Sequence, residues 1–425
     1  MLIISGAKGD TRRYRCFHLY EQLRLADLDC QVHLITEWNI LNKVNWQDMV
    51  IFHRVIEDRL SDRIFSAISR LGGVALMDVD DLLFDETAYQ WINSPDFRDP
   101  IRTSLYQEEM GRFRNALQRC QGVLASTDFL AQRVKSLNIP VWVHRNTFSL
   151  EMLALSKSAF EGKSKSKDTV VIGYGSGTPT HNRDFAMVKP ALVKILEKYP
   201  QTELYLVGAI EAGKDWGKLA DRIKHYPLVH WRELPSMLAN FDINLAPLVS
   251  DNPFAQSKSE IKYMEAGLVK VPTVASPTDA FRYAIRPNEN GFLAATEEEW
   301  VAALSMLIEQ ESLREATGEK AYEDVIERYH PAVRSMELMK TLDRINQAFP
   351  GKAYRKINAG KSSSVIAFNL QGKDMNDFSV SRQLESLPTL VQRGIYSIHY
   401  RSIGTLLRQI WIQIRRWAEP LFPFT

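Results

Sequence analysis

The chain has 425 residues, of which 45% are hydrophobic and 24% charged, and its formal net charge is +2. This length predicts two domains with their own cores, and the near-neutral charge argues against a nucleic-acid partner. Its three cysteines are scattered and lack the spacing of metal ligands, so they are expected to be small buried residues of a reducing cytosol. The sequence has no run of about 18 apolar residues, so no membrane-spanning helix is expected. The residues that flank the N-terminal apolar segment are unlike those of a signal peptide.

The first part of the chain alternates apolar strands with amphipathic helices. This alternation predicts a parallel sheet with helices on both faces, in a first domain over residues 1–155. The strands are predicted over 2–5, 32–36, 49–53, 74–77, 122–125 and 141–143, and the helices over 15–26, 64–71, 103–119 and 127–137.

Residues 156–168 are polar and rich in lysine, which predicts a linker. A second strand–helix series follows over residues 169–330 and predicts a second α/β domain of the same doubly wound type. Its strands are predicted over 169–173, 203–207, 243–246 and 271–275, and its helices over 185–199, 234–241, 297–309 and 312–329.

An acidic motif, Asp78-Val-Asp80-Asp81, follows the strand over 74–77. Three carboxylates within four residues are costly without a cation or contact with water. Three interpretations remain open: a divalent metal site, a helix N-cap at Asp80 or Asp81, or carboxylates that point into a cleft at the end of the strand.

A glycine- and serine-rich loop follows the first strand of the second domain. Such a loop lets the backbone approach a ligand and donate N–H and hydroxyl hydrogen bonds, although alone it is more often a plain turn. The candidate binding residues of this loop are Gly175, Ser176, Gly177, Thr178, His181 and Arg183.

The segment 251–295 predicts a loop, a helix and a short strand. Ser257, Lys258 and Ser259 stand where the helix is expected to begin, which is a favourable place for phosphate oxygens. Lys262 and Glu265 lie further along the same helix, and a carboxylate there can accept hydrogen bonds from the vicinal hydroxyls of a ribose. The alternative is an ordinary amphipathic helix with a solvated charged face.

At these residues the chain resembles the nucleotide-sugar glycosyltransferases of the GT-B fold, in particular the retaining family-four group, the glycosyl transferases group 1. The resemblance rests on Glu265-Ala266, on Pro272-Thr-Val-Ala-Ser276 and on Gly291-Phe-Leu. The first glutamate of the family motif is replaced by Ser257. The pattern NPF…KS…KY.EAG is similar to that of a subgroup of these enzymes.

The resemblance implies two Rossmann-like domains with the nucleotide bound by the second, and a helix over 331–350 that returns to the first. It implies that Glu265 binds the ribose, that Lys258, Ser257 and Ser259 bind the diphosphate, and that Asp80 or Asp81 faces the transferred sugar as a catalytic group. The loop Arg and Lys of the family are missing, so Arg183 and Lys258 are the candidate cations. No metal or cofactor is expected.

The loop Gly6–Arg15 carries Arg12, Arg13 and Arg15. In the family this loop faces the cleft between the domains. It is therefore expected either to bind an anionic or lipid-phosphate acceptor or to cap the following helix.

The tail over 351–425 has eleven Lys and Arg and four Asp and Glu, a net charge of +7 that leaves −5 for the remainder. Residues 401–417 predict an amphipathic helix with arginines on one face and Trp411 and Trp417 as aromatic anchors. Such a helix suits an anionic membrane surface, and the alternative is a helix docked on the first domain.

The resemblance therefore implies a hexosyltransferase-type glycosyltransferase that retains configuration. Its partners would be a nucleotide-sugar donor and a glycan or lipid-linked acceptor of cell-surface glycan synthesis, and its location cytoplasmic, at the inner face of the plasma membrane. Two alternatives stay open: an inactive GT-B scaffold or binding protein tethered by its tail, and a sugar-nucleotide epimerase.

Overall fold

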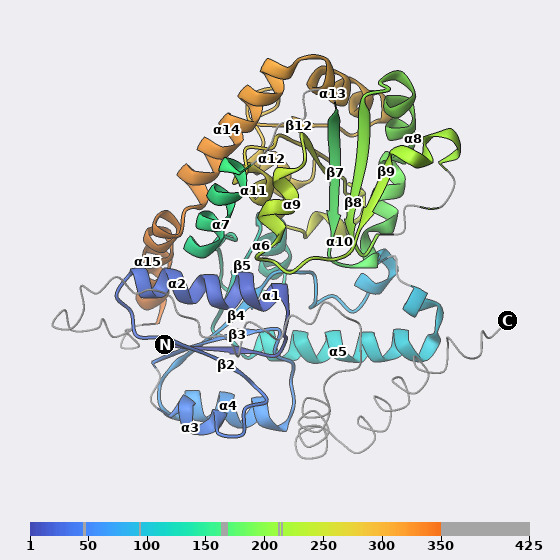
Figure 1. Cartoon of the computed structure of the whole chain (residues 1–425). Coiled ribbons are helices and arrows are strands. Elements are labelled where there is room, and N and C mark those ends of the chain that lie inside the picture. The colour runs from blue at the N-terminus through green and yellow to red at the C-terminus, as the bar shows by residue number, and fades with distance from the viewer. Residues whose placement is uncertain (46–47, 93–94, 163–168, 211–212, 214–215, 350–425) are drawn as a thin grey trace.

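The computed structural model describes residues 1–45, 48–92, 95–162, 169–210, 213 and 216–349. Two parallel six-stranded sheets form two stacked α/β domains (Figure 1). The predicted fold of two doubly wound Rossmann-like domains is confirmed. The predicted tail and its helix over 401–417 lie outside the described residues. None of the helices within the described ranges combines the length and the apolar character needed to cross a bilayer.

The first sheet has the strand order β2-β1-β3-β4-β5-β6, with every neighbouring pair parallel. Along β3, Val50 and Phe52 pack into one core, and Met49 and Ile51 pack into another on the opposite face. Strands covered on both faces read as continuous apolar runs, which is why this pattern was visible in the sequence. The strands are β1 (Leu2–Ser5), β2 (Gln31–Leu34), β3 (Met49–His53), β4 (Val74–Val79), β5 (Gly122–Ala125) and β6 (Val141–Val143).

The helices of the first domain flank this sheet on both faces. They are α1 (Asp10–Arg12), the π-helical turn η1 (Arg13–Phe17), α2 (His18–Leu25), α3 (Ile40–Val44), α4 (Arg59–Arg70), the short η2 (Ala88–Trp91) and η3 (Pro95–Arg98), α5 (Pro100–Gln118) and α6 (Asp128–Lys135).

The second sheet has the order β12-β11-β10-β7-β8-β9. The sequence did not predict β9 and β12, which are edge strands. The strands are β7 (Val170–Ser176), β8 (Thr202–Gly208), β9 (Ile223–Tyr226), β10 (Ile243–Ala246), β11 (Thr273–Ala275) and β12 (Phe292–Leu293). The helices are η4 (Pro179–His181), α8 (Asn182–Lys198), η5 (Gly217–Arg222), α9 (Leu234–Ala239), α10 (Pro253–Gln256), α11 (Ile261–Gly267), α12 (Asp279–Ala284), α13 (Glu297–Glu309) and α14 (Glu311–Tyr329).

The chain crosses between the domains twice. Helix α7 (Leu150–Glu161) leaves the first sheet and packs on α9, so the first six residues of the predicted linker are helical. Helix α15 (Pro331–Ala348) returns beside α2, where Leu338 and Leu342 join the first domain's core (Figure 1). Between the crossings, the Thr147 hydroxyl donates to the backbone oxygen of Tyr329, which ties the two passages together.

Glu21 on α2 predicts a dependence of stability on pH. Its side chain is buried and accepts from the backbone N–H of Leu150 at 3.0 Å, and burial raises its pKa to about 7. Because the folded pKa lies above the ordinary value, this group's contribution to stability is complete below about pH 4.5 and is lost as the pH rises through 7. We expect the free energy of unfolding of Glu21→Gln, relative to that of the wild type, to rise by about 2 kcal/mol between pH 5 and pH 8. Denaturant unfolding at the two pH values measures the difference.

The matched control is Glu161→Gln, at the other end of α7, whose side chain is 62% exposed. Its unfolding free energy should follow the wild type at both pH values. Parallel curves for Glu21→Gln and the wild type would show that the Glu21 carboxyl does not titrate on unfolding.

Candidate active site

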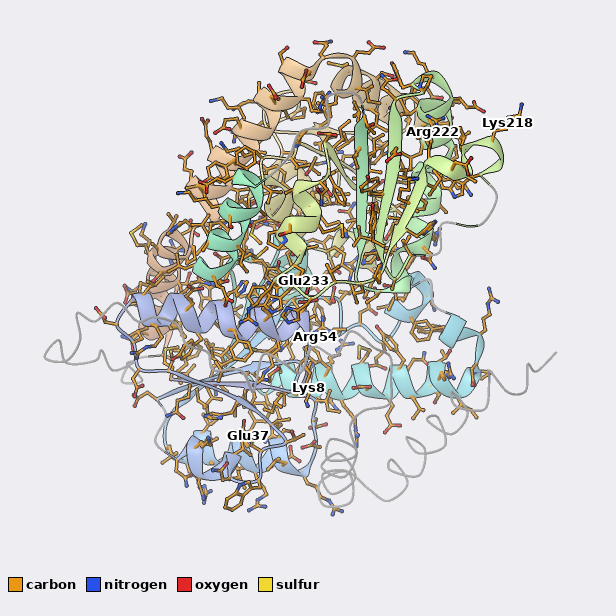
Figure 2. The ribbon with its side chains drawn as sticks, viewed as in Figure 1. Lys8, Glu37, Arg54, Lys218, Arg222 and Glu233 are labelled. Atoms are coloured by element: carbon orange, nitrogen blue, oxygen red, sulfur yellow. The ribbon has the colours of Figure 1, made fainter. Side chains whose placement is uncertain are left out.

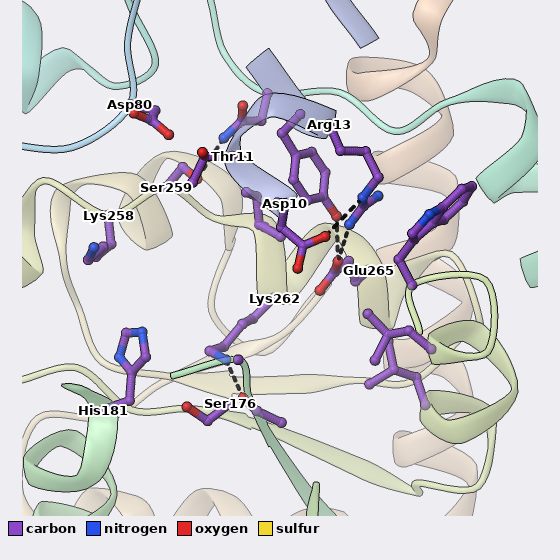
Figure 3. Close-up of a pocket in the computed structure, with 18 of the residues that line it drawn as sticks. Asp10, Thr11, Arg13, Asp80, Ser176, His181, Lys258, Ser259, Lys262 and Glu265 are labelled. Carbon is purple, nitrogen blue, oxygen red and sulfur yellow. Dashed lines mark hydrogen bonds and ion pairs between the residues drawn. The ribbon is translucent and has the colours of Figure 1, made fainter. Parts of the chain in front are cut away.

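A cavity of about 300 Å³ lies where the carboxyl ends of β7 and β8 face the first domain. This is the position at which open α/β sheets bind ligands. The residues that line it include Asp10, Thr11, Arg13, Tyr14, Arg15, Asp80, Asp81 and Asn146 from the first domain, and Gly175, Ser176, Gly177, His181, Lys258, Ser259, Lys262 and Glu265 from the second. Figure 3 shows Lys262 between Lys258 and Glu265 along the cavity.

The predicted phosphate-binding turn precedes α11. Asn252 caps the short helix α10 by accepting from the backbone N–H groups of Phe254 and Ala255, so the chain is still in that helical turn at Ser257. The Ser257 hydroxyl is buried and donates to the Phe254 backbone oxygen at 2.7 Å. Helix α11 begins only at Ile261, which corrects the predicted helix start. Lys258, in the turn between, lines the cavity, but Ser257 does not.

Ser259 also lines the cavity, and its hydroxyl accepts from the Asn146 side-chain amide at 2.8 Å. Asn146 belongs to the segment that leaves the first sheet. The turn before α11 is thereby fixed to the first domain beside the cavity.

Lys262 and Glu265 are one helical turn apart on α11 and both point into the cavity. Lys262 donates to the backbone oxygen of Gly175, and burial lowers its pKa. Burial raises the pKa of Glu265, and Arg13 and Tyr14 offset part of that increase. Tyr14 donates its hydroxyl hydrogen to the Glu265 carboxylate, and Arg13 lies 4.0 Å from the same group.

The glycine-rich loop closes the second domain's side of the cavity. A side-chain carbon added at Gly175 or Gly177 would meet no heavy atom within 4 Å, so these positions leave the cavity open rather than fit against protein. Ser176 donates to the Thr178 backbone oxygen at 2.8 Å, which holds the turn. His181 also lines the cavity and is held by Asp184 at 2.8 Å.

Two other predicted residues of this loop face elsewhere. The Thr178 hydroxyl pairs with that of Thr180 at 2.7 Å and does not line the cavity. Arg183 lies in a small neighbouring hollow beside Trp91.

Asp80 and Asp81 both line the cavity and are bound by cations. Arg54 reaches both oxygens of Asp80 at 3.0 Å and Asp81 at 2.7 Å, and Lys258 reaches Asp81 at 2.6 Å. Burial alone would raise the pKa of Asp80, but the Arg54 guanidinium outweighs it and holds that pKa well below its usual range. No helix begins here, so the N-cap interpretation is wrong. Within the described ranges no three His, Cys, Asp or Glu side chains cluster in a way that would hold a metal.

The arginine-bearing segment is helical from Asp10, whereas the sequence predicted a loop over residues 6–15. All three arginines are buried. Arg12 stacks on Phe17, at 4.9 Å from the ring centroid, away from the cavity. Arg15 is bound by Asp78 at 2.7 and 2.8 Å, which leaves Arg13 as the arginine that approaches Glu265.

Sequence reasoning missed three kinds of residue at this site. Tyr14 stood next to a candidate arginine but carried no motif signal. Arg54, directly after β3, carried no motif signal, yet it holds both predicted catalytic carboxylates and lies where the two domains meet (Figure 2). The apolar end of the cavity had no readable pattern, and it is lined by Val207, Leu228, Val229, Trp231, Leu234 and Leu238.

Comparison with known families identifies this cavity-bearing domain. Residues 169–310 match the family model described as glycosyl transferases group 1. The second domain is a glycosyl transferases group 1 domain. The match covers β7 to α13, including the glycine-rich loop and α11, and it confirms both the resemblance seen in the sequence and the predicted enzyme class of hexosyltransferase-type glycosyltransferase.

Solved structures similar to this glycosyltransferase share its two-domain GT-B fold at low identity. HepE from Anabaena, solved with UDP and glucose, is 14% identical with a TM-score of 0.52, over 81% of this chain and 100% of its own. Sucrose-phosphate synthase from Thermosynechococcus elongatus is 11% identical with a TM-score of 0.58, over 82% and 99%. A glycosyltransferase from Rickettsia africae is 13% identical with a TM-score of 0.57, over 82% and 99%. No curated protein sequence matches the chain significantly.

Proposed function

We propose that this glycosyltransferase moves a sugar from a nucleoside diphosphate donor to a glycan or lipid-linked acceptor, with retention of configuration. One observation carries the proposal: Lys258 and Glu265, seven positions apart in the group 1 domain, line the same cavity at the carboxyl ends of the strands. A cation at one end and a carboxylate at the other suit a diphosphate and a ribose. The binding of UDP and glucose by HepE, which shares the fold, is consistent with this class of donor.

The reaction breaks the bond between the sugar's anomeric carbon and the diphosphate oxygen and forms a bond to an acceptor hydroxyl oxygen. The proton of that hydroxyl passes to the departing diphosphate oxygen, and the nucleoside diphosphate leaves with the bonding electron pair. Negative charge therefore grows on the leaving phosphate, where Lys258 and the Ser259 hydroxyl are proposed to stabilise it. The apolar end around Trp231 and Leu234 is proposed to hold the base.

The test is a thermal-shift screen of the full chain with UDP, GDP and dTDP and their sugars, followed by turnover of any sugar nucleotide that stabilises it. We expect one base to raise Tm and its sugar conjugate to be turned over. The proposal fails if Lys258→Ala and Glu265→Ala leave the affinity for every such nucleotide unchanged.

We also propose that the basic tail over 351–425 brings the enzyme to the inner face of the plasma membrane, where cell-surface glycan precursors are assembled. The charge of +7 and the arginine-bearing pattern of 401–417 support this. The full chain should sediment with anionic vesicles and not with neutral ones, and the chain ending at Gly394 with neither. Equal sedimentation of both chains would contradict the proposal.

A further inference from the structure

Two of the proposed donor contacts of the second domain, Lys258 and Glu265, are occupied by side chains of the first. Lys258 pairs with Asp81, which follows β4, at 2.6 Å. Glu265 accepts the hydroxyl hydrogen of Tyr14, which belongs to η1. The cavity side chains that would receive a nucleoside diphosphate are thus engaged across the gap between the domains.

The chemistry of the two first-domain groups matches the two ends of the donor. Asp81 offers an oxyanion to Lys258, as a phosphate would. Tyr14 offers a hydroxyl to Glu265, as a ribose would. An anion therefore meets the cation and a hydroxyl donor meets the carboxylate, each at its proposed position.

The charges that line the cavity are also balanced. Among the described residues that line it, four cationic side chains face four carboxylates: Arg13, Arg15, Lys258 and Lys262 against Asp10, Asp80, Asp81 and Glu265. A diphosphate adds negative charge to a partly buried site, which is unfavourable unless a cation of the cavity is released from its carboxylate to pair with the diphosphate.

The two first-domain groups are held firmly. Arg54 binds both Asp80 and Asp81, and its own backbone is left-handed at φ 51°, a strained conformation for a residue other than glycine. Arg13 stacks between the rings of Tyr14 and Trp231, at 4.2 and 5.0 Å from their centroids. These contacts fix the Asp81 carboxylate and the Tyr14 hydroxyl at the cavity wall.

We propose that Asp81 and Tyr14 act together as an internal mimic of the donor, which occupies Lys258 and Glu265 while no donor is bound. The inference rests on the proposed function, because the mimicry has meaning only if Lys258 and Glu265 receive a nucleoside diphosphate. An incoming donor takes Lys258 from Asp81 and Glu265 from Tyr14, so its affinity is lowered by the two contacts it displaces. The same exchange breaks both of these contacts between the domains, so Asp81 and Tyr14 are released from the second domain only when a donor is present.

The test measures the Kd of free UDP, GDP and dTDP by calorimetry for the full chain. We expect Asp81→Asn and Tyr14→Phe each to lower the Kd of the preferred nucleotide about three- to tenfold, and the double variant to lower it further. Lys258→Ala is expected to raise it. Melting temperatures without nucleotide verify that each variant is folded.

Two pairs elsewhere in the second domain supply matched controls. Tyr199→Phe removes another tyrosine–glutamate hydrogen bond, to Glu309, and Glu297→Gln removes another lysine–carboxylate pair, to Lys194 at 2.6 Å. None of these residues lines the cavity, so both variants should bind nucleotide as the wild type does.

The outcomes separate this inference from the proposed function. Unchanged or weaker binding by Asp81→Asn and Tyr14→Phe, with binding by the wild type intact, overturns the donor mimic and leaves the glycosyltransferase proposal standing. Binding by the double variant where the wild type binds nothing supports the mimic strongly. Failure of the wild type and the double variant to bind any of the three nucleotides overturns both.

Discussion

Replacing Lys258 with methionine is expected to lower kcat/KM for the preferred nucleotide sugar about 100-fold, mostly through kcat. The reason is that the leaving diphosphate gains charge as the glycosidic bond breaks, and Lys258 lies in the cavity wall at the proposed diphosphate end. Lys262 cannot fully replace it, because its ammonium group is bound to the Gly175 backbone oxygen and burial lowers its pKa. Initial-rate kinetics on purified variants give the measurement.

Lys194→Met is the matched control, since Lys194 pairs with Glu297 on the surface of the same domain and should be dispensable for turnover. Lys258→Met also strips Asp81 of a cation, so Lys258→Met/Asp81→Asn is needed as a second variant. We expect the double variant to stay slow, because restoring charge balance does not restore a cation for the leaving group. Full activity of Lys258→Met would remove this residue from the proposed chemistry.

The layers of the fold were predictable because both sheets are parallel and buried. A strand such as β3 is apolar at every position facing either core, and helices such as α4 and α8 connect neighbouring parallel strands. The edge strands of the second sheet lack that signal: β9 carries Lys224 and His225 on exposed positions, and β12 has two residues. Their membership of the sheet comes from pairing with β8 and β11 and not from their own composition.

The candidate site was predictable only where a local motif carried the chemistry. The spacing from Lys258 to Glu265 brought both residues into the cavity even though α11 begins later than expected. Ser257 does not line the cavity, because Asn252 starts a separate short helix that ends with Ser257 as its C-cap. The partners of Asp80 and Asp81 lie far away in sequence, so no local pattern could reveal that Arg54 and Lys258 neutralise them.

Replacing Arg54 with methionine is expected to lower the free energy of unfolding at pH 7 by about 3 kcal/mol. Arg54 is the bidentate partner of Asp80 and also binds Asp81, and these carboxylates are only 9% and 15% exposed. Removing the cation leaves two like charges side by side with little water. Denaturant unfolding at pH 7 measures the loss.

The loss should shrink as the pH falls. In the wild type the pKa of Asp80 is held low. The contribution of this carboxylate to stability is therefore present at any pH above the ordinary pKa of an aspartate, and it is lost only when the pH falls through the folded pKa. Without Arg54, burial and the neighbouring Asp81 favour the protonated acid, with His53 at 3.8 Å and Lys258 as the cations that remain nearby. The variant then binds protons more readily when folded, and its deficit relative to the wild type is expected to be smaller at pH 5 than at pH 8.

Arg54→Met/Asp80→Asn should recover part of the lost stability, because it removes the carboxylate that Arg54 bound through both oxygens. Arg112→Met serves as the surface control: its contact to Glu108 at 3.9 Å is half-exposed, and its loss should cost less than about 1 kcal/mol. If Arg54→Met and Arg112→Met lose the same free energy of unfolding at every pH, Arg54 does not stabilise the charged forms of the two aspartates. In that case the Asp81 carboxylate would lack the rigid support that a fixed partner for Lys258 requires.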